Sequence, residues 1–486
     1  MLFNSSAFLL FFPVVTGLFF ALPHRYRWLW LLLTSCYFYM SLVPVYILIL
    51  FFIILVDYLA GLGIEATTGL RRKILLVISL VTNIGVLVAF KYYNFLAVNV
   101  LTVLHELGWS ETVPMLTWAL PIGLSFHTFQ AMSYTIEVYR GNQRAEHHIG
   151  IYALYVLFYP QMVAGPIERP QNILPQLHSK QPFSYENVVA GLQLMGWGLF
   201  KKIVIADRLA PMVGSVYNHP ADYMGPSLIL ATLLFSFQIF CDFSGYSDIA
   251  IGSARVMGYK LTINFDRPYF SKNSTEFWRR WHISLSTWFR DYVYIPLGGN
   301  RVPLWRQGVN LLIVFLLSGI WHGANWTFII WGLLHGIYLL GDLVIRQRRY
   351  RAETVYTWMQ KVWRAGLTFS LISFAWIFFR ANNVNDAFYI VSHLTTGWGQ
   401  TFNHLNDLTF VRINLLLGES KQLVVAVLLA ILLMEVVHYL QRNPHWQVSF
   451  CKQPAWVRWS VYYIGLLVIL LFGVYDAPAQ FIYFQF

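Results

Sequence analysis

Long apolar runs separated by short polar stretches make up most of this 486-residue chain. The first runs cover residues 5–22, 28–40 and 43–62, and the gap between the second and third leaves room only for a turn. Further runs follow at residues 75–90, 115–136, 150–164, 188–205, 226–240, 309–320, 326–345, 364–379, 421–440 and 458–474. A perpendicular span needs roughly 20 apolar residues, so we expect some re-entrant helices among about 10 to 13 membrane-embedded ones. The pattern predicts an all-α, polytopic membrane protein.

The composition agrees with this prediction. Hydrophobic residues make up 57% of the chain and charged residues only 12%, whereas a soluble protein has roughly 25% charged residues. No hydrophilic run is long enough for a separate soluble domain, so residues 1–486 are expected to form a single integral-membrane domain. Residues 1–22 lack the basic start and the cleavage site of a signal peptide, which favours a retained first span.

The positive charge lies in the gaps between apolar runs. The net charge is +12, and basic clusters occur at residues 24–27, 71–73 and 346–351. Short loops rich in Lys and Arg remain in the cytoplasm, which places the N-terminus on the outer side. The same charge attracts anionic lipid headgroups, and nucleic acid is not expected as a partner.

Two polar segments, residues 163–177 and 240–252, interrupt the apolar pattern. Pro and Gly make the first a poor helix, so at membrane depth it must be buried in protein or line a cavity. In the second, Asp242 borders an apolar helix, where a carboxylate is costly unless it has a partner. We expect Asp242 to neutralise a nearby arginine or to cap a helix, with a direct catalytic role as the alternative.

Residues 274–292 are predicted to form one amphipathic helix, for which Asn273 and Glu276 are a plausible capping pair. At 100° per residue, aromatic side chains share one face. Polar side chains gather on the opposite face: Arg279, Arg280, His282, Ser286, Arg290 and Asp291. Such a helix lies along the membrane surface with its cations toward headgroups or an anionic ligand. His282 is then either an ordinary polar-face residue or part of a site.

His322 follows the apolar run at 309–320. The loops before this run and after the next one are basic, so both are expected in the cytoplasm and the run rises away from it. Twelve helical residues rise about 18 Å, which puts His322 deep in the membrane or toward its outer side. This is a costly place for a titratable group.

An imidazole at that depth can be a structural hydrogen-bonding group, a metal ligand, a proton relay or a general base. No metal is expected, because His335 lies on another face and the three cysteines are far apart. Ser318 lies one turn before His322, but a Ser-His-acid triad would need an acid from elsewhere. Trp321 and Asn325 offer hydrogen-bond donors beside the imidazole. The residues alone leave both a structural and a catalytic His322 open.

Three long blocks, residues 238–252, 276–301 and 317–336, resemble the signature blocks of bacterial membrane-bound O-acyltransferases. Residues 120–141 and 165–170 extend the resemblance, which covers roughly residues 1–380 and leaves spans 381–486 weakly similar. Within the family the chain is most similar to members that O-acetylate alginate. It differs from them at Glu168 and in the segment 126–130, so the polymer is left open.

The resemblance implies a ring of membrane helices around a central tunnel in a bacterial inner membrane, with a periplasmic N-terminus. His322 would be the catalytic residue, and His282 would lie near the tunnel on the cytoplasmic side. An acyl group, expected to be acetyl, would pass from a cytoplasmic thioester such as acetyl-CoA to an exported polysaccharide such as alginate, directly or through periplasmic acetyl-transfer proteins. No tightly bound cofactor is implied.

The roles expected of individual residues rest on both the family resemblance and the chemistry of their side chains. His322 is the expected general base that removes a proton from the acceptor hydroxyl. Arg279, Arg280 and Arg290 are the candidate donor-binding residues, because guanidinium groups suit phosphates. Trp321, Asn325, Ser318, Asp242 and Asp291 are candidate tunnel or supporting residues. The alternatives are a transporter with a proton-relay histidine and a non-catalytic scaffold of an export complex.

Overall fold

The computed structural model describes residues 1–41, 43–109, 112–118, 121–162, 165–348, 357–443, 445–475 and 481–482. Helices make up nearly all of its regular structure, and these residues contain no β-strand. Nine helices among them are long and apolar enough to cross a membrane, and α1 is a shorter apolar helix. The predicted all-α polytopic class is confirmed. The predicted 10 to 13 membrane-embedded helices include re-entrant ones, and that number stays a prediction. The basic cluster at 346–351 lies largely outside the described residues.

The chain divides into two compact units, residues 1–195 with 247–263 and residues 196–246 with 264–486. Helices α10 (Tyr185–Leu199) and α12 (Gly225–Val256) contribute residues to both. The other helices of the first unit are α1 (Ser6–Ala21), α2 (His24–Met40), α3 (Ile47–Ala66), α4 (Gly69–Leu87), α5 (Tyr93–Glu106), α6 (Leu124–Arg140), α7 (Ile149–Leu157), α8 (Tyr159–Met162) and α9 (Pro170–His178).

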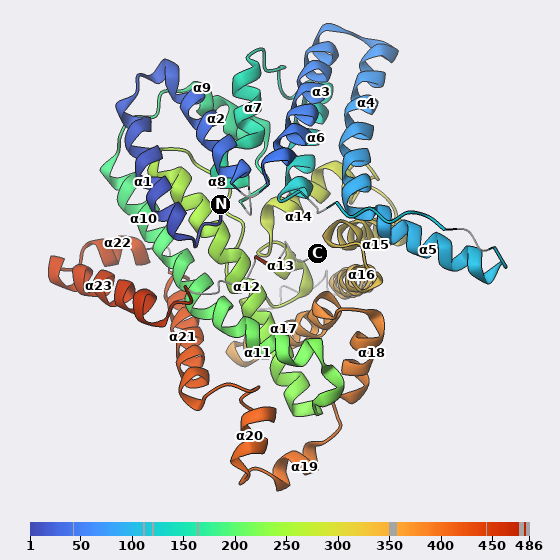
Figure 1. The fold of residues 1–486 in the computed structure, drawn as a ribbon, viewed down its shortest axis with the longest axis vertical. Helices are drawn as coiled ribbons and strands as arrows, with labels where there is room; N and C mark the ends of the chain where they lie inside the picture. Colours follow the sequence, from blue (N-terminus) through green and yellow to red (C-terminus); the bar gives the residue numbers. More distant parts are fainter. Residues whose placement is uncertain are drawn as a thin grey trace. The chain divides into compact units, whose positions relative to one another are not determined.

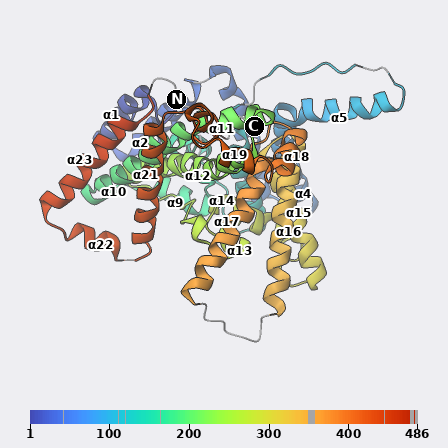
Figure 2. The same ribbon diagram turned by 90° about the horizontal axis from the view of Figure 1, so that it is seen from below.

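The second unit begins in the last residues of α10, continues into a π-helical turn, η3 (Phe200–Ala206), and has α21, α22 and α23 as its last helices (Figure 2). Its short central elements are α13 (Ser274–Trp278), α14 (Ile283–Phe289) and the π-helical η6 (Arg290–Tyr294). Its other helices are α11 (Asp207–Asn218), α15 (Leu304–His322), α16 (Trp326–Arg348), α17 (Trp358–Arg380), α18 (Val384–His393), α19 (Trp398–Asn403), α20 (Leu408–Asn414), α21 (Lys421–Leu440), α22 (Trp446–Cys451) and α23 (Ala455–Phe472).

A buried polar cluster joins α3, α4 and α6, which pack against one another in the first unit (Figure 1). Asp57 Oδ1 accepts hydrogen bonds from Ser79 Oγ at 2.6 Å and from Asn83 Nδ2 at 3.0 Å. Ser79 Oγ also lies 2.9 Å from Thr135 Oγ1. Because a polar group in an apolar bundle is stabilised only when it is hydrogen-bonded, these contacts fix how the three helices meet.

Two segments differ from their predicted conformation. Residues 240–252 lie inside the 32-residue helix α12 instead of between spans. Its small residues permit this, because Gly245 approaches the backbone of Gly198 so closely that a Cβ atom would lie 2.8 Å from the Gly198 oxygen. The segment from Gly165 is irregular and buried, as expected, but from Pro170 it forms α9, with a proline in the first turn where its missing N–H costs nothing.

Candidate functional site

His322 is the last residue of α15, a helix that begins at Leu304 and has 19 residues. The sequence prediction started this helix five residues too late, because it counted only apolar positions and left the polar first turn after Pro303 in a loop. Nineteen helical residues rise about 28 Å, close to the thickness of a bilayer core. His322 therefore lies about a full membrane thickness from the start of α15, instead of about half of one.

The His322 imidazole is enclosed by aromatic rings from three helices. Its centroid lies 4.9 Å from that of Trp321, 4.8 Å from Trp331 on α16 and 5.4 Å from Phe379 on α17. All three rings meet the imidazole edge to face, and His322 is only 3% exposed. These rings exclude water and lower the local dielectric, which strengthens electrostatic interactions of the imidazole with a reacting group.

Glycines allow α15 and α16 to meet beside His322. A Cβ atom on Gly319 would lie 2.4 Å from the Phe328 carbonyl oxygen, and one on Gly332 would lie 2.3 Å from that of Phe315. A Cβ on Gly323 would lie 2.1 Å from the Phe328 ring. The predicted close backbone approach around His322 is confirmed.

We expect Gly319→Ala to destabilise the protein, because the new methyl group must push the α16 backbone away. Gly341→Ala is the matched control on α16, since a Cβ atom there meets nothing within 4 Å. By helix propensity alone, each substitution would stabilise by about 1 kcal/mol. The midpoint of thermal unfolding in detergent should therefore fall for Gly319→Ala and stay or rise for Gly341→Ala; equal shifts would contradict the tight contact.

The predicted continuous helix over residues 274–292 is wrong. The chain forms α13, breaks at residues 279–282, and resumes as α14 and η6. Asn273 does cap α13, since its Oδ1 accepts a hydrogen bond from the Glu276 N–H at 2.8 Å. At the break, His282 has φ 44° and ψ 55°, a left-handed conformation that costs a non-glycine residue roughly 1–2 kcal/mol. The helical wheel could not foresee this, because it assumed an unbroken helix.

Asn264 holds the chain at the break. Its backbone oxygen accepts from the Ile283 N–H at 2.9 Å. Its Oδ1 accepts from Ser284 Oγ at 2.9 Å and lies 3.2 Å from His282 Nδ1. Because this oxygen only accepts, the His282 proton lies on Nδ1, and Nε2 is the accepting nitrogen of the neutral ring. Burial lowers the pKa of His282 to about 3, so the ring is neutral at physiological pH.

The break turns His282 away from the arginines and into the core. His282 is 1% exposed and packs 4.6 Å from the Phe243 ring, whereas Arg279 and Arg290 are exposed. Its ring also lies 6.3 Å from Trp321, the residue that packs on His322. The sequence prediction that the two histidines lie on opposite sides of a membrane is therefore wrong, because both contact the same indole.

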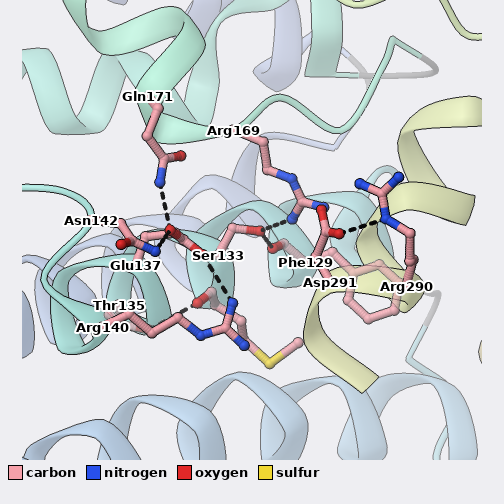
Figure 3. Close-up of polar contacts among 11 residues, drawn as sticks. Phe129, Ser133, Thr135, Glu137, Arg140, Asn142, Arg169, Gln171, Arg290 and Asp291 are labelled. Atoms are coloured by element: carbon pink, nitrogen blue, oxygen red, sulfur yellow. Dashed lines mark hydrogen bonds and ion pairs between the residues drawn. The ribbon is translucent and has the colours of Figure 1, made fainter. Parts of the chain in front are cut away.

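The three candidate donor-binding arginines do not form one uncompensated cationic face. Arg280 Nη2 pairs with Glu276 Oε1 at 2.7 Å, and Arg290 Nε pairs with Asp291 Oδ1 at 2.7 Å (Figure 3). Arg279 makes no ion pair with any residue that the structure describes. Asp291, a candidate supporting residue, thus partners a surface arginine.

Asp242 belongs to a buried ion cluster between α12 and η3. Lys202 Nζ lies 2.6 Å from Asp242 Oδ1 and 2.7 Å from Asp207 Oδ1, and all three side chains are at most 4% exposed. Asp242 Oδ2 accepts from the Ile482 N–H at 2.7 Å. The expectation that Asp242 has a cationic partner is confirmed, but the partner is a lysine and not an arginine.

Ser318 and Asn325 flank His322. Ser318 lies one helical turn before it and is 4% exposed. Asn325 Nδ2 donates to the Asn382 carbonyl at 3.0 Å, and its Oδ1 accepts from the Thr327 N–H at 3.1 Å. These bonds anchor the turn between α15 and α16. The tunnel or supporting role of Ser318 and Asn325 stays a prediction.

Sequence reasoning missed several residues of this region. Trp331 contacts both His322 and His335, whose Nδ1 accepts from Trp278 Nε1 at 3.2 Å. Asn264 was also missed, since it precedes His282 by 18 residues and has no motif around it. The described residues hold no group of His, Cys, Asp or Glu that could bind a metal ion.

Comparison with known proteins identifies the family. Residues 90–381 match the model of the membrane-bound O-acyltransferase family. The chain is 33% identical to the peptidoglycan O-acetyltransferase of Helicobacter pylori over 94% of this chain and 91% of that protein. It is 37% identical to the probable alginate O-acetylase AlgI of Azotobacter vinelandii over 86% and 83%.

A more distant relative, the teichoic acid D-alanyltransferase of Streptococcus thermophilus, is 33% identical over 47% of this chain and 58% of that protein. These relatives are named for transferring acyl groups, and the chain carries membrane-length apolar helices. It therefore belongs to the membrane-bound O-acyltransferase family and is a multi-pass membrane acyltransferase.

Proposed function

We propose that this protein transfers an acetyl group from a thioester donor to hydroxyl groups of an exported glycan, with His322 as general base. The observation that carries the proposal is the enclosure of His322 by three aromatic rings at the end of a membrane-length helix. A sequestered neutral imidazole is suited to take a proton from a hydroxyl group as that group attacks. The names of the relatives support acetyl as the group transferred.

The proposed step is a direct acyl transfer. The acceptor oxygen attacks the thioester carbonyl carbon while His322 takes the hydroxyl proton. The tetrahedral intermediate then collapses, the C–S bond breaks, and the imidazolium returns the proton to the leaving thiolate. The products are an O-acetyl ester and a free thiol, and His322 ends neutral. His282 is the second proposed catalytic residue. It would lie on the side of Trp321 from which the thioester donor enters, and its Nε2 is the nitrogen that can accept a hydrogen bond or a proton there.

The membrane arrangement is part of the proposal. The basic clusters at residues 24–27 and 71–73 favour a cytoplasmic side for these loops and a periplasmic N-terminus in a bacterial inner membrane. The thioester, such as acetyl-CoA, would then approach from the cytoplasm through a central tunnel. The acceptor, either the glycan or a periplasmic acetyl-transfer protein, would approach from the other side. A transporter or scaffold role is not favoured, because the relatives are transferases by name.

Arg279 is the arginine best suited to the phosphates of the donor, because the other two candidates already pair with carboxylates. We expect Arg279→Gln to raise the apparent donor KM roughly tenfold with little change in kcat, because one charge-assisted hydrogen bond to the donor is lost. Arg290→Gln is the matched control and should change donor KM less. An unchanged donor KM in Arg279→Gln would contradict the assignment, as would equal effects of both substitutions.

Two glycans compete as the acceptor. The alginate O-acetylase of Pseudomonas aeruginosa aligns with 80% of this chain, whereas the peptidoglycan enzyme aligns with 94%. Because the peptidoglycan enzyme aligns with more of this chain, peptidoglycan is a candidate acceptor beside an alginate-type polysaccharide. Alkali-released acetate should be measured on purified peptidoglycan and on exopolysaccharide, with and without this protein. If acetate is lost from one of the two glycans when the protein is absent, that glycan is the acceptor. If acetate is lost from neither, the proposed function is refuted.

A further inference from the structure

A cavity of about 190 Å³ lies in the first unit, and part of the basic cluster at residues 24–27 lines it. Its lining includes residues of α2, α7 and α9, and α7 packs against both of the other helices (Figure 1). Its volume corresponds to roughly six water molecules, enough for a phosphate ester group. Basic side chains dominate the polar part of its lining: His24, Arg25, Arg27, His148 and His178.

Arg27 is the most buried of these cations, at 9% exposure. Its guanidinium donates to three backbone carbonyls, those of Gln181 at 2.6 Å, Leu22 at 3.1 Å and Phe20 at 3.3 Å. No carboxylate in the described chain pairs with it. A guanidinium group carries five N–H donors in a rigid fork, so the carbonyls hold it in place while its positive charge is left without a counter-ion.

The surrounding groups add to this positive charge. Helix α2 begins at His24 after Pro23, with no side-chain cap and no acidic residue in its first turn. The N–H groups of that turn and the helix dipole both favour an anion. In the described chain, Glu146 is the one carboxylate that bonds to the lining, through His178 Nε2 at 2.6 Å and the His148 N–H at 2.9 Å. One carboxylate does not balance two arginines.

We propose that this cavity binds a phosphate group, from either an anionic phospholipid headgroup or a phosphorylated acyl donor. Arg27 provides the fixed charge, and the more accessible Arg25 and His24 close around the ligand from the first turn of α2. The proposal does not depend on the acyl-transfer mechanism, because none of these residues belongs to the His322 region. All the residues that α2 contributes lie outside the residues 90–381 that match the family model.

The test compares two double variants of the full-length protein, since changing Arg27 itself would remove three hydrogen bonds that hold the fold. His24→Gln with Arg25→Gln removes charge from the cavity. Arg71→Gln with Lys73→Gln is the control, because both residues are exposed basic residues outside the lining. Phosphatidylglycerol retention is measured by native mass spectrometry in detergent, and coenzyme A binding is measured in phosphatidylcholine nanodiscs.

We expect the cavity variant to bind one of the two probes roughly tenfold more weakly than wild type, and the control variant to bind it within about twofold. Loss of phosphatidylglycerol assigns a lipid headgroup, and loss of coenzyme A assigns the donor. Unchanged binding of both probes would overturn the proposal. Equal losses in both double variants would overturn it too, because they would reflect net charge alone.

Discussion

Replacing His322 with glutamine is expected to lower acetyl transfer by roughly 10²- to 10⁴-fold, the usual contribution of a general base. Glutamine retains hydrogen-bonding groups and similar bulk inside the ring of Trp321, Trp331 and Phe379, so the protein should still fold and insert. The measurement is ester-linked acetate on the envelope glycan of cells that carry the variant, normalised to the amount of protein in the membrane.

His335→Gln is the matched control. His335 is also fully buried, and it also packs on Trp331, at 4.8 Å. A glutamine there can still accept the hydrogen bond from Trp278 Nε1, so we expect less than a tenfold loss of acetylation. Equal loss in both variants would mean that the aromatic packing matters and not the chemistry of His322, and the general-base role would be refuted.

Replacing Lys202 with methionine is expected to destabilise the second unit severely. Asp207 and Asp242 would then be buried without their shared cation, and breaking a buried ion pair on one side costs about 3–5 kcal/mol. The yield of monodisperse protein and the midpoint of thermal unfolding in detergent should both fall. Converting both acids to asparagine in the Lys202→Met background should recover part of the loss, because no uncompensated charge is left.

Lys201→Met provides the comparison for this experiment. Lys201 is also buried, at 3% exposure, and it donates to Ser244 Oγ at 2.9 Å. Asp207 and Asp242 keep Lys202 as their shared cation in this variant, so the effect should be much smaller. Similar losses in Lys201→Met and Lys202→Met would contradict the role given to the ion cluster.

The apolar pattern predicted the spans well because bilayer thickness fixes their length. Residues 421–440 form α21 with the predicted bounds, and a single 3₁₀ turn, Pro44–Tyr46, leads into the predicted third span. Helices whose first turn is polar, such as α15, were predicted to start too late in the sequence. The polar segment 240–252 was misplaced because Lys202, which makes its carboxylate tolerable, lies 40 residues earlier than Asp242.

The sequence predicted the surroundings of His322 but not those of His282. His322 stood out because a titratable group at the end of an apolar run is rare, and the glycines around it predicted the close helix contact. The neighbourhood of His282 depends on a break in the helix, and that break depends on Asn264. A helical wheel contains no tertiary contacts, so it put His282 with the arginines. The loop charges then placed it far from His322.

The central claim is that His322 carries out acyl transfer. Inner-membrane vesicles from cells with wild-type protein, His322→Gln or His335→Gln retain any partner chains and can be supplied with labelled acetyl-CoA. The rate of ester-linked label appearing on glycan is the measurement. The account predicts rapid labelling by wild type, most of that rate in His335→Gln, and labelling near background in His322→Gln. Labelling by His322→Gln at the wild-type rate would contradict it.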